Sequence, residues 1–260
     1  MKSSPLVTLL SDFGTRDGYV AAMKGVIYRQ CPEARVVDAA HDIARHDIRS
    51  AAWVLRQYGW TFPAGTLHIA VVDPGVGTDR AALVIEAGDQ FWLGPDNGLF
   101  AWILKQYAKA KVWQLKAGVV RPGGSSATFH GRDLFAYAAG LLAKGVRLER
   151  LADPMDSWFE PDWLIPVLHG RTLEGQVLHV DHFGNLITNL PAHLVLDRGP
   201  DAVVSIGKLK LKGIGHTYAD VPVGKPLALI GSDGMLEVAV NQGDASVLLG
   251  KSTGAKVLLV

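Results

Sequence analysis

The sequence predicts two domains of different class: an N-terminal three-layer α/β/α domain with a mostly parallel sheet, and a small C-terminal all-β barrel domain. Strand-like and helix-like segments alternate up to about residue 150, whereas beyond Gly170 short runs of Val, Leu and Ile are separated by Gly, Asn and Asp. The 29 glycines in 260 residues indicate many tight turns. We place the boundary near residue 165, giving domains of residues 1–165 and 166–260.

In the first domain, short apolar runs predict strands, and apolar residues at helical spacing predict helices. The first strand covers Leu6–Leu10, and a helix over Tyr19–Gln30 ends at the Cys31-Pro32 pair. The remaining predictions are strands at Arg35–Asp38, Thr66–Val72 and Ala81–Glu86, and helices at Ile48–Tyr58, Leu99–Tyr107 and Arg132–Lys144. This alternation is typical of parallel strands with helices on the faces of their sheet.

The second domain follows a connector, residues 153–163, that has no clear period and contains two prolines and two tryptophans. No long helical pattern appears after it. The predicted strands cover residues 176–180, 185–189, 202–206, 208–212, 226–230, 235–240 and 256–260. Short strands at this spacing indicate a small antiparallel barrel or sandwich.

The composition excludes several classes of protein. Twenty-six Lys and Arg against 25 Asp and Glu leave a net charge of +1, too small to indicate binding to nucleic acid or to an anionic membrane. Cys31 is the single cysteine, so neither a disulfide framework nor a thiolate metal cluster is expected. The apolar runs are much shorter than the ~20 residues of a membrane-spanning helix, and the N-terminal residues lack a secretory-signal pattern. We therefore expect a cytoplasmic protein.

The segment SDFGTRDG, residues 11–18, follows the first predicted strand, where open α/β sheets bind ligands. The carboxylates of Asp12 and Asp17 are suited to accept hydrogen bonds from the vicinal hydroxyls of a ribose. The alternative is that these residues form the turn and cap the next helix, and the sequence alone does not decide. The glycine spacing excludes a phosphate-binding loop.

The segment HDIARHD, residues 41–47, has the residue types of a metal site. His41 and His46 are five residues apart, which places them on neither one helical face nor one strand face. We therefore favour N-capping of the following helix by Asp47 over a metal-dependent phosphohydrolase site.

Asp73 directly follows the most apolar predicted strand and begins DPGVGTDR, a tight loop rich in Pro and Gly. Arg80, at the end of this segment, can fold back beside Asp73, and such a pair is either a catalytic candidate or an ordinary surface ion pair. GPDNG, residues 94–98, has the composition of a simple turn. TFHGRD places His130 directly before a predicted helix, where a lone histidine is more often a capping or packing residue.

Two polar, glycine-punctuated segments stand out in the second domain, DHFGNLITN at residues 181–189 and GSDGMLEVAVNQGDAS at residues 231–246. Phe183 offers a stacking face for a base, and the amide of Asn185 is suited to a purine edge. Hairpin turns have the same composition, so spacing alone leaves both interpretations open.

The chain resembles the S-adenosylmethionine hydrolase (adenosine-forming) family in six segments that occur in this order across nearly its whole length: SDFGTRDGYVAAMKG, VVDPGVGTDR, GPDNG, FHGRD, DHFGN and GSDGMLEVAVNQGDAS. That family is related to fluorinating and chlorinating enzymes that use the same substrate. The resemblance implies a homotrimer with active sites between subunits and no metal or cofactor. The reaction it implies converts S-adenosylmethionine and water to adenosine and L-methionine.

The resemblance also implies site residues. The family's catalytic Asp, Arg and His correspond to Asp73, Arg80 and His130. The substrate-binding positions are Asp12 for the ribose, Asp17, Asp181 and Ser232 for the methionine part, Asn185, Val240 and Asn241 for the adenine, and Phe183 and Glu237 as further candidates. Halogenating relatives carry an aromatic residue in place of Asp73 and Tyr in place of His130. In the fluorinating branch an Arg follows the methionine-binding Ser, whereas Asp233 follows it here.

Two alternatives to hydrolysis accompany this interpretation. One is an S-adenosylmethionine-dependent chloride adenosyltransferase, and the other is a non-catalytic protein that binds adenosine or S-adenosylmethionine. All three functions imply a small-molecule partner and neither nucleic acid nor a membrane.

Overall fold

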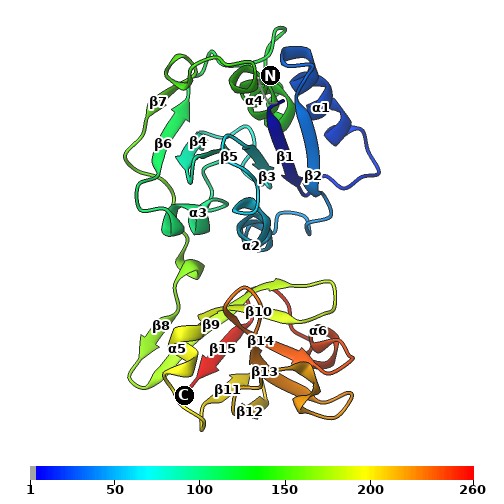
Figure 1. The fold of residues 1–260 in the computed structure, drawn as a ribbon, viewed down its shortest axis with the longest axis vertical. Coiled ribbons are helices and arrows are strands. Elements are labelled where there is room, and N and C mark those ends of the chain that lie inside the picture. Colours follow the sequence, from blue (N-terminus) through cyan, green and yellow to red (C-terminus); the bar gives the residue numbers. More distant parts are fainter. Residues whose placement is uncertain (1–3) are drawn as a thin grey trace. The chain divides into compact units, whose positions relative to one another are not determined.

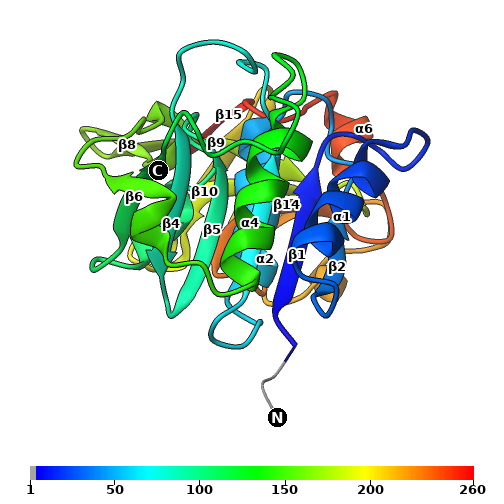
Figure 2. The same cartoon turned by 90° about the horizontal axis from the view of Figure 1, so that it is seen from above.

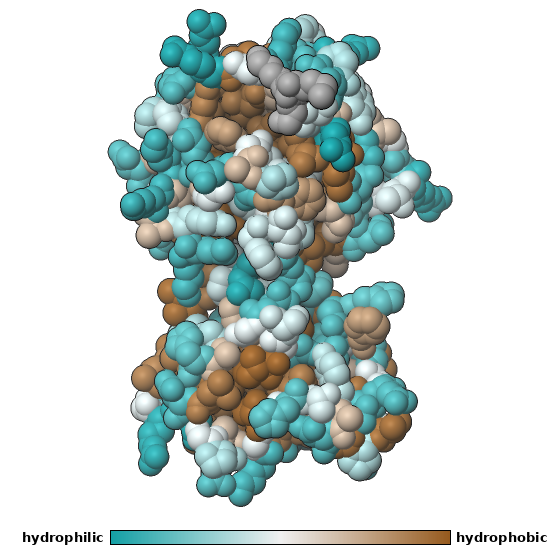
Figure 3. Space-filling model, in the orientation of Figure 1, coloured by the Kyte–Doolittle hydropathy of each residue, from teal (hydrophilic) through white to brown (hydrophobic). Residues whose placement is uncertain are grey.

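The structure is a computed structural model that describes residues 4–260. The chain divides into two compact units, one ending at Pro161 and one beginning at Asp162, and each is described by itself (Figure 1). None of the helices in residues 4–260 combines the length and the apolar character needed to cross a membrane. The face drawn in Figure 3 is mostly polar, with separate apolar patches on each unit.

The first unit begins with alternating strands and helices, as the sequence predicts, and then has three consecutive strands without a helix between them. Its elements are β1 (Leu6–Ser11), α1 (Tyr19–Gln30), β2 (Arg35–Ala40), α2 (Ile48–Gly59), β3 (Leu67–Val71), β4 (Ala82–Ala87), β5 (Gln90–Pro95), α3 (Ala101–Gln106), β6 (Lys111–Leu115), a π-helical turn (Gly131–Phe135), α4 (Ala136–Ala143), a 3₁₀ turn (Leu148–Arg150) and β7 (Ala152–Pro154).

The strands of this unit form one mixed sheet in the order β2-β1-β3-β5-β4-β6-β7. Strands β2, β1, β3 and β5 are parallel, whereas β4, β6 and β7 run antiparallel to their neighbours. The antiparallel part arises because β4 and β5 are joined by the two-residue turn Gly88-Asp89, in which both residues have positive φ. The sequence analysis did not predict β5, β6 or β7.

Helices cover both faces of this sheet, which confirms the predicted fold class. Helices α1 and α4 pack together on one face, and α2 and α3 pack on the other (Figures 1 and 2). Helix α1 buries Val20, Met23 and Ile27, which recur at helical spacing. The carboxylate of Asp47 caps α2 by accepting the backbone N–H of Ser50 at 3.0 Å, so the capping prediction is confirmed.

The predicted helix over residues 132–144 is irregular at its start. The π-helical turn Gly131–Phe135 precedes α4, and the backbone N–H of Ala136 donates to the carbonyl of Gly131, five residues earlier. Part of the segment therefore has a wider turn than the expected α-helix.

The second unit is a barrel-like antiparallel sheet, again as the sequence predicts. Its elements are a 3₁₀ turn (Asp162–Leu164), β8 (Val167–His169), β9 (Thr172–Val180), β10 (Leu186–Pro191), α5 (Ala192–Leu196), β11 (Val203–Ile206), β12 (Leu209–Lys212), a 3₁₀ turn (Tyr218–Asp220), β13 (Pro226–Ile230), β14 (Met235–Val240), α6 (Ala245–Leu249) and β15 (Lys256–Leu259).

These strands pair in the order β12-β11-β15-β9-β10-β14-β13, with β8 added beside β9. A bridge between Gly215 and Leu229 links the segment after β12 to β13, so the sheet nearly closes on itself. Alternate residues of the strands fill the interior, among them Val177, Val204 and Leu236.

Candidate active site

Asp73 and Arg80 form a buried ion pair at the carboxyl end of β3. The chain leaves β3 two residues before Asp73 and enters β4 two residues after Arg80, so the loop between them returns to the same edge of the sheet. Nε of Arg80 lies 3.1 and 3.0 Å from the two carboxylate oxygens of Asp73, and Nη2 lies 2.5 Å from Oδ2. The Asp73 and Arg80 side chains are 4% and 10% exposed, so this is not a surface ion pair.

The loop that carries this pair is held by local turns. The N–H of Val76 donates to the carbonyl of Asp73, and Thr78 donates both N–H and Oγ1–H to the carbonyl of Gly75. Gly77 has φ +81°, and a Cβ there would lie 2.5 Å from the carbonyl oxygen of Ala127. Glycine is therefore required at this position by both its conformation and its close approach to a second loop.

The GPDNG segment also supports this edge of the sheet. Nδ2 of Asn97 donates to the carbonyl of Val72 at 2.9 Å, and the N–H of Asp96 donates to the carbonyl of Ala81 at 3.0 Å. These contacts fix the backbone directly before Asp73 and directly after Arg80. GPDNG therefore supports the backbone on both sides of this loop, in addition to forming a turn.

His130 joins the pair from the start of the π-helical turn. Its Nδ1 lies 2.9 Å from Nη2 of Arg80. Burial and the neighbouring Arg80 charge lower the pKa of His130, although the carboxylates of Asp73 and Asp133 act in the opposite direction. Because a guanidinium donates and never accepts, Nδ1 is the acceptor and the neutral ring carries its proton on Nε2.

The guanidinium of Arg80 is held on several sides. Besides Asp73 and His130, its Nη1 donates to the carbonyl of Ala81 at 3.2 Å, and its Cζ lies 5.5 Å from the centroid of the Phe135 ring. Asp73 therefore balances the positive charge of Arg80, and the surrounding contacts hold the guanidinium in one orientation. The structure brings together the three side chains that the sequence analysis assigned to catalysis.

A pocket of about 450 Å³ lies beside these residues, within the first unit. Three aromatic rings, Phe13, Tyr19 and Phe129, contact one another there with centroids 5.3 to 5.8 Å apart. The residues lining the pocket are Asp12, Phe13, Asp17, Tyr19, Arg45, His46, Val71, Asp73, Val76, Thr128, Phe129, His130 and Gly131. The pocket thus combines an aromatic wall with charged groups at a sheet's carboxyl edge, where ligands commonly bind.

Asp12 and Asp17 both line this pocket, as their assignment to the substrate requires. Oδ2 of Asp12 accepts the backbone N–H of His46 at 2.9 Å, and His46 has φ +65°, an uncommon conformation for a residue with a side chain. The side chain of Asp17 is exposed at the pocket. Both carboxylates therefore remain within reach of a ligand.

The second histidine of HDIARHD has a different environment from the first. His41 is buried, with Nδ1 2.7 Å from Oγ of Ser11 and Nε2 3.0 Å from a carboxylate oxygen of Asp38. His46 lines the pocket instead. Within residues 4–260, no three His, Cys, Asp or Glu side chains gather in a way suited to a metal ion.

The second unit holds the remaining candidates. Asp181 and Asn185 are bonded to each other: Oδ1 of Asp181 accepts the N–H of Asn185 at 2.8 Å, and Oδ2 accepts its Nδ2–H at 2.9 Å. The same Oδ1 accepts the N–H of Phe183, a residue that is 73% exposed. The DHFGN segment is therefore a tight turn that presents an exposed aromatic face.

Glu237 lies nearly buried in β14 and accepts the hydroxyl of Tyr218 at 2.7 Å. Burial raises the pKa of Glu237, and the carboxylates of Asp181 and Asp233 raise it further, whereas the hydrogen bond from Tyr218 lowers it. The charge of Asp181 thus acts on Glu237, so these two predicted residues are electrostatically linked.

The other three predicted residues of this unit have different surroundings. Ser232 is exposed on the β13–β14 turn. Val240 packs in the barrel core, and Nδ2 of Asn241 donates to the carbonyl of Val221 at 2.6 Å. The side chains of Val240 and Asn241 are therefore already engaged in holding the barrel.

Sequence reasoning did not assign Tyr19, Arg45, Phe129 or Tyr218. Tyr19 directly follows SDFGTRDG and Phe129 is the first residue of FHGRD, so their place in recognised motifs was a usable signal. Tyr218 lies 19 residues from Glu237, and no local pattern connects them.

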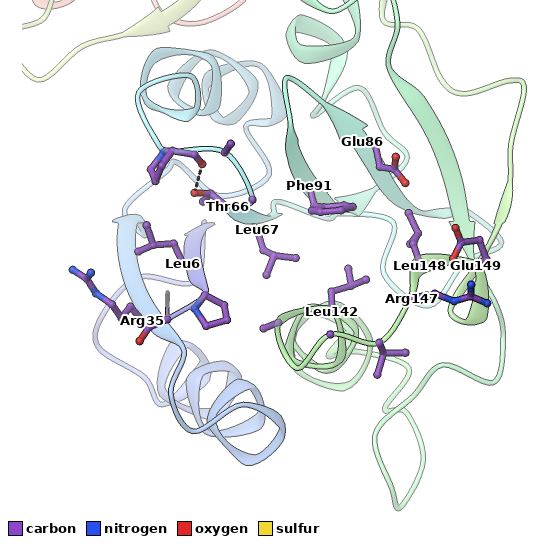
Figure 4. A pocket seen from close by; sticks show the side chains of 18 residues that line it. Leu6, Arg35, Thr66, Leu67, Glu86, Phe91, Leu142, Arg147, Leu148 and Glu149 are labelled. Atoms are coloured by element: carbon purple, nitrogen blue, oxygen red, sulfur yellow. Dashed lines mark hydrogen bonds between the residues drawn. The ribbon is translucent and has the colours of Figure 1, made fainter. Parts of the chain in front are cut away.

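A larger pocket of about 830 Å³ lies at the opposite edge of the first sheet (Figure 4). It is bordered by the amino ends of β1, β2 and β3, and Leu67, Phe91 and Leu142 project into it. The guanidinium groups of Arg35 and Arg147 lie at its sides and point away from its centre. This cavity lacks the converging polar groups of the Asp73 pocket.

Comparison with known proteins now identifies the family. The SAM hydroxide adenosyltransferase family matches residues 7–152 with its N-terminal domain and residues 175–258 with its C-terminal domain. The matches to both domains therefore place the chain in a class of enzymes. The chain is a member of the SAM hydroxide adenosyltransferase family, which confirms the resemblance found in the sequence.

Individual relatives agree with this assignment. A Thermus thermophilus protein named (R)-S-adenosyl-L-methionine hydrolase is 40% identical, and the match covers 98% of this chain and 99% of the relative. The crystal structure of an uncharacterized conserved protein from Thermotoga maritima is 35% identical with a TM-score of 0.87, covering 97% of this chain and 99% of that one. A fluorinase of Nocardia brasiliensis is more distant, at 25% identity over 91% of this chain and 90% of the relative.

Proposed function

We propose that this enzyme hydrolyses S-adenosyl-L-methionine to adenosine and L-methionine. The observation that carries the proposal is the buried Asp73–Arg80–His130 constellation beside a pocket at the carboxyl edge of the sheet. Relatives named (R)-S-adenosyl-L-methionine hydrolase support the substrate, and their name favours the R configuration at the sulfonium sulfur.

The chemistry of the leaving group determines which steps of the reaction the site must assist. Water attacks C5′ in line with the C5′–S bond, a new C–O bond forms, and the electron pair of the C–S bond leaves with sulfur as a neutral thioether. Departure therefore needs no general acid. The difficult part is to make water a sufficient nucleophile and to accept its proton.

Prior removal of the water proton by Asp73 is too costly. The pKa of bulk water is about 15.7 and that of a free Asp about 3.9, so full transfer costs roughly 16 kcal/mol at ~1.36 kcal/mol per unit. A turnover of ~10 per second corresponds to a total barrier of about 16 kcal/mol, which leaves nothing for the C–O bond.

We therefore propose that Asp73 orients the water and takes its proton late, as the C5′–O bond forms. Arg80 holds the carboxylate in a fixed orientation for this proton transfer. His130, which lines the pocket, donates its Nε2–H to the same water. Asp12 is proposed to bind the ribose, and Asp17, Asp181, Ser232 and Glu237 the methionine part, with Phe183, Asn185, Val240 and Asn241 at the adenine.

Transfer to chloride is the alternative within the same family, and the charge balance of the site disfavours it. The guanidinium of Arg80 is already neutralised by Asp73, and its donors are directed to Asp73, Ala81 and His130. A halide beside Asp73 would face a carboxylate whose guanidinium partner is already paired. We further propose a homotrimer with active sites between subunits and turnover that needs no metal, to be tested by light scattering and by assay with a chelator.

The decisive experiment supplies the R and S sulfonium epimers separately to the purified protein in ¹⁸O-water, with chloride replaced by an inert anion. We expect adenosine labelled at its 5′ oxygen, formed faster from the R epimer. Absence of labelled adenosine with both epimers would refute hydrolysis. Turnover that returns only with chloride would establish the halide reaction, and tight adenosine binding without turnover would establish a binding protein.

A further inference from the structure

The π-helical turn places two residues against the same guanidinium. His130 directly precedes the turn, and Phe135 ends it. Nδ1 of His130 lies 2.9 Å from Nη2 of Arg80, and the Phe135 ring centroid lies 5.5 Å from its Cζ. In an α-helix, side chains five residues apart diverge by about 140°, whereas a turn closed by i→i+5 bonds brings them closer together.

Asp133, in the middle of this turn, is fully buried and lies at the centre of a network of its own. Oδ1 of Asp133 accepts Nε–H of Arg121 and, at 2.6 Å, Nε–H of Arg132. Oδ2 accepts Nη2–H of Arg132 at 2.9 Å and the backbone N–H of Ser126 at 2.8 Å. Each carboxylate oxygen therefore has two donors.

The network keeps Asp133 ionised. Burial by itself would raise the pKa of Asp133, but the hydrogen bonds from Arg132, Ser126 and Arg121 outweigh it and hold the pKa well below its usual range. A buried carboxylate with these partners is stable, whereas loss of its charge leaves two guanidiniums without their acceptor. The charge of Asp133 thus balances the two guanidiniums that contact it.

Asp133 also ties the preceding loop to the turn. The N–H of Arg121 donates to the carbonyl of Asp133 at 3.0 Å, which closes the loop at its start. Near the other end of the loop, the carbonyl of Ala127 lies against Gly77 of the DPGVGTDR segment. The guanidinium of Arg132 lies 4.7 Å over the Phe129 ring, part of the aromatic wall of the pocket. The carboxylate of Asp133 therefore links the π-helical turn, the loop that precedes it and the aromatic wall of the pocket.

We propose that Asp133 is a positioning residue that, with Arg121 and Arg132, holds the π-helical turn so that His130 and Phe135 fix the Arg80 guanidinium. Asp133 is outside the pocket and does not contact the reacting atoms. Its role is to set the direction of Arg80 and the proton position on His130. The inference deepens the proposed function, since it concerns the same site.

The test compares Asp133→Asn and Arg132→Lys with the wild-type protein. Asp133→Asn keeps the side-chain shape and removes the charge, and Arg132→Lys keeps a charge but loses the two-pronged contact. Gln90→Leu serves as the matched control, because Gln90 donates to the carbonyls of Gly59 and Phe62 at the opposite edge of the sheet. That variant loses buried hydrogen bonds without touching the turn.

We expect kcat to fall about 10- to 100-fold in both network variants with KM changed by less than about two-fold, because misplacement of a reacting group by ~1 Å costs a factor of this size. The second readout is nitrogen NMR of selectively labelled histidine, with the His130 signal assigned by its loss in His130→Asn. In the wild-type protein, His130 should carry its proton on Nε2 and accept through Nδ1. In Asp133→Asn and Arg132→Lys, His130 should show a mixture of both tautomers. Gln90→Leu should retain the wild-type kcat and tautomer.

An unchanged His130 tautomer in folded Asp133→Asn would overturn the proposal, whatever its rate. If Asp133→Asn does not fold, the His130 tautomer in Arg132→Lys tests the proposal instead, and an unchanged tautomer there would overturn it. The NMR result does not depend on turnover. A wild-type protein that fails to hydrolyse S-adenosylmethionine would therefore refute the proposed function and still leave the positioning role to be decided by the tautomer.

Discussion

Nη2 of Arg80 lies 2.9 Å from Nδ1 of His130, and this contact determines which ring nitrogen carries the proton. A guanidinium has no lone pair to offer, so the imidazole accepts through Nδ1 and can donate through Nε2. His130 is therefore a donor in this site, and the proton of the attacking water has to go elsewhere. Asp73 is the acceptor that the geometry provides within hydrogen-bond reach of Arg80.

Asp73→Asn should separate catalysis from binding. The amide keeps the size of the side chain but cannot accept the water proton, so we expect kcat to fall by about 10²- to 10⁴-fold. Adenosine affinity, measured by calorimetry, should change little because Asp73 is not assigned to the nucleoside. Asp79→Asn is the matched control, since Asp79 is exposed in the same loop. Loss of adenosine binding in step with the rate would contradict the catalytic assignment.

Two replacements of His130 should differ in effect. Asn places an acceptor near the position of Nδ1, so it can keep the contact with Arg80 but loses the donor at Nε2. Gln places its amide near Nε2 and can keep that donor. We therefore expect His130→Asn to lower kcat by about 10²- to 10³-fold, as for loss of one donor to developing charge, and His130→Gln to lower it less. The opposite order would show that the Arg80 contact, and not the donor, is what catalysis uses.

The pH dependence of the rate should report His130. Protonation of Nδ1 would place a donor against Nη2–H of Arg80, so the site is assembled when the ring is neutral. Because burial and Arg80 lower the pKa of His130, the rate should stay constant as the pH falls through 6.5, the ordinary value, and decrease at a lower pH. This acid limb should move or disappear in His130→Gln. An acid limb that is the same in both proteins would assign it to another group.

Tyr218→Phe tests the cluster in the second unit. Removing the hydroxyl leaves the nearly buried Glu237 without its hydrogen bond, and the pKa of Glu237 should rise further because that bond lowers it. If Glu237 binds the cationic methionine part, loss of about 1 kcal/mol should raise KM roughly five-fold with kcat unchanged. Tyr28→Phe, an exposed tyrosine on α1, is the control. An unchanged KM would remove Glu237 from the binding site.

Local sequence patterns were sufficient to predict the elements that bury one face. Helix α1 has Val20, Met23 and Ile27 at helical spacing, and β3 is an apolar run that is buried throughout. Strand β4 was predicted, but not its antiparallel direction, because that direction depends on the Gly88-Asp89 turn, which looks like any polar pair until its positive φ angles are known. Apolar periodicity predicts whether a segment is a helix or a strand, but not whether a strand runs parallel or antiparallel to its neighbours.

The candidate active site was also predictable only where local sequence position was enough. The sequence placed Asp73 at a strand end and His130 before a helix, which are properties of local position. Their contact through Arg80 joins residues 50 positions apart, and the resemblance to a family, not any spacing, brought them together in advance. The π-helical turn was read as ordinary helix because its width depends on arginines that approach Asp133 in the folded chain. Tertiary partners, and not propensity, decided these features.

Stability at acid pH should depend on His68, in the core of the first unit. This side chain is fully buried, its Nδ1 lies 2.8 Å from Oγ1 of Thr8, and its ring stacks on Trp92 at 4.1 Å. Burial lowers the pKa of His68 to about 3 from 6.5. The unfolded chain therefore binds a proton that the native protein does not over this range, so the free energy of unfolding falls as the pH drops from 6.5 towards 3.

The size of this effect can be measured with His68→Leu. At ~1.36 kcal/mol per unit, the wild-type protein should lose about 3 kcal/mol between pH 7 and pH 4.5 through this residue, and the variant should lack that contribution. Urea unfolding followed by tryptophan fluorescence at both pH values gives the comparison. His169→Leu, which removes an exposed histidine, should lose as much stability as wild type. Equal losses in wild type and His68→Leu would mean that the native core accommodates the charged ring.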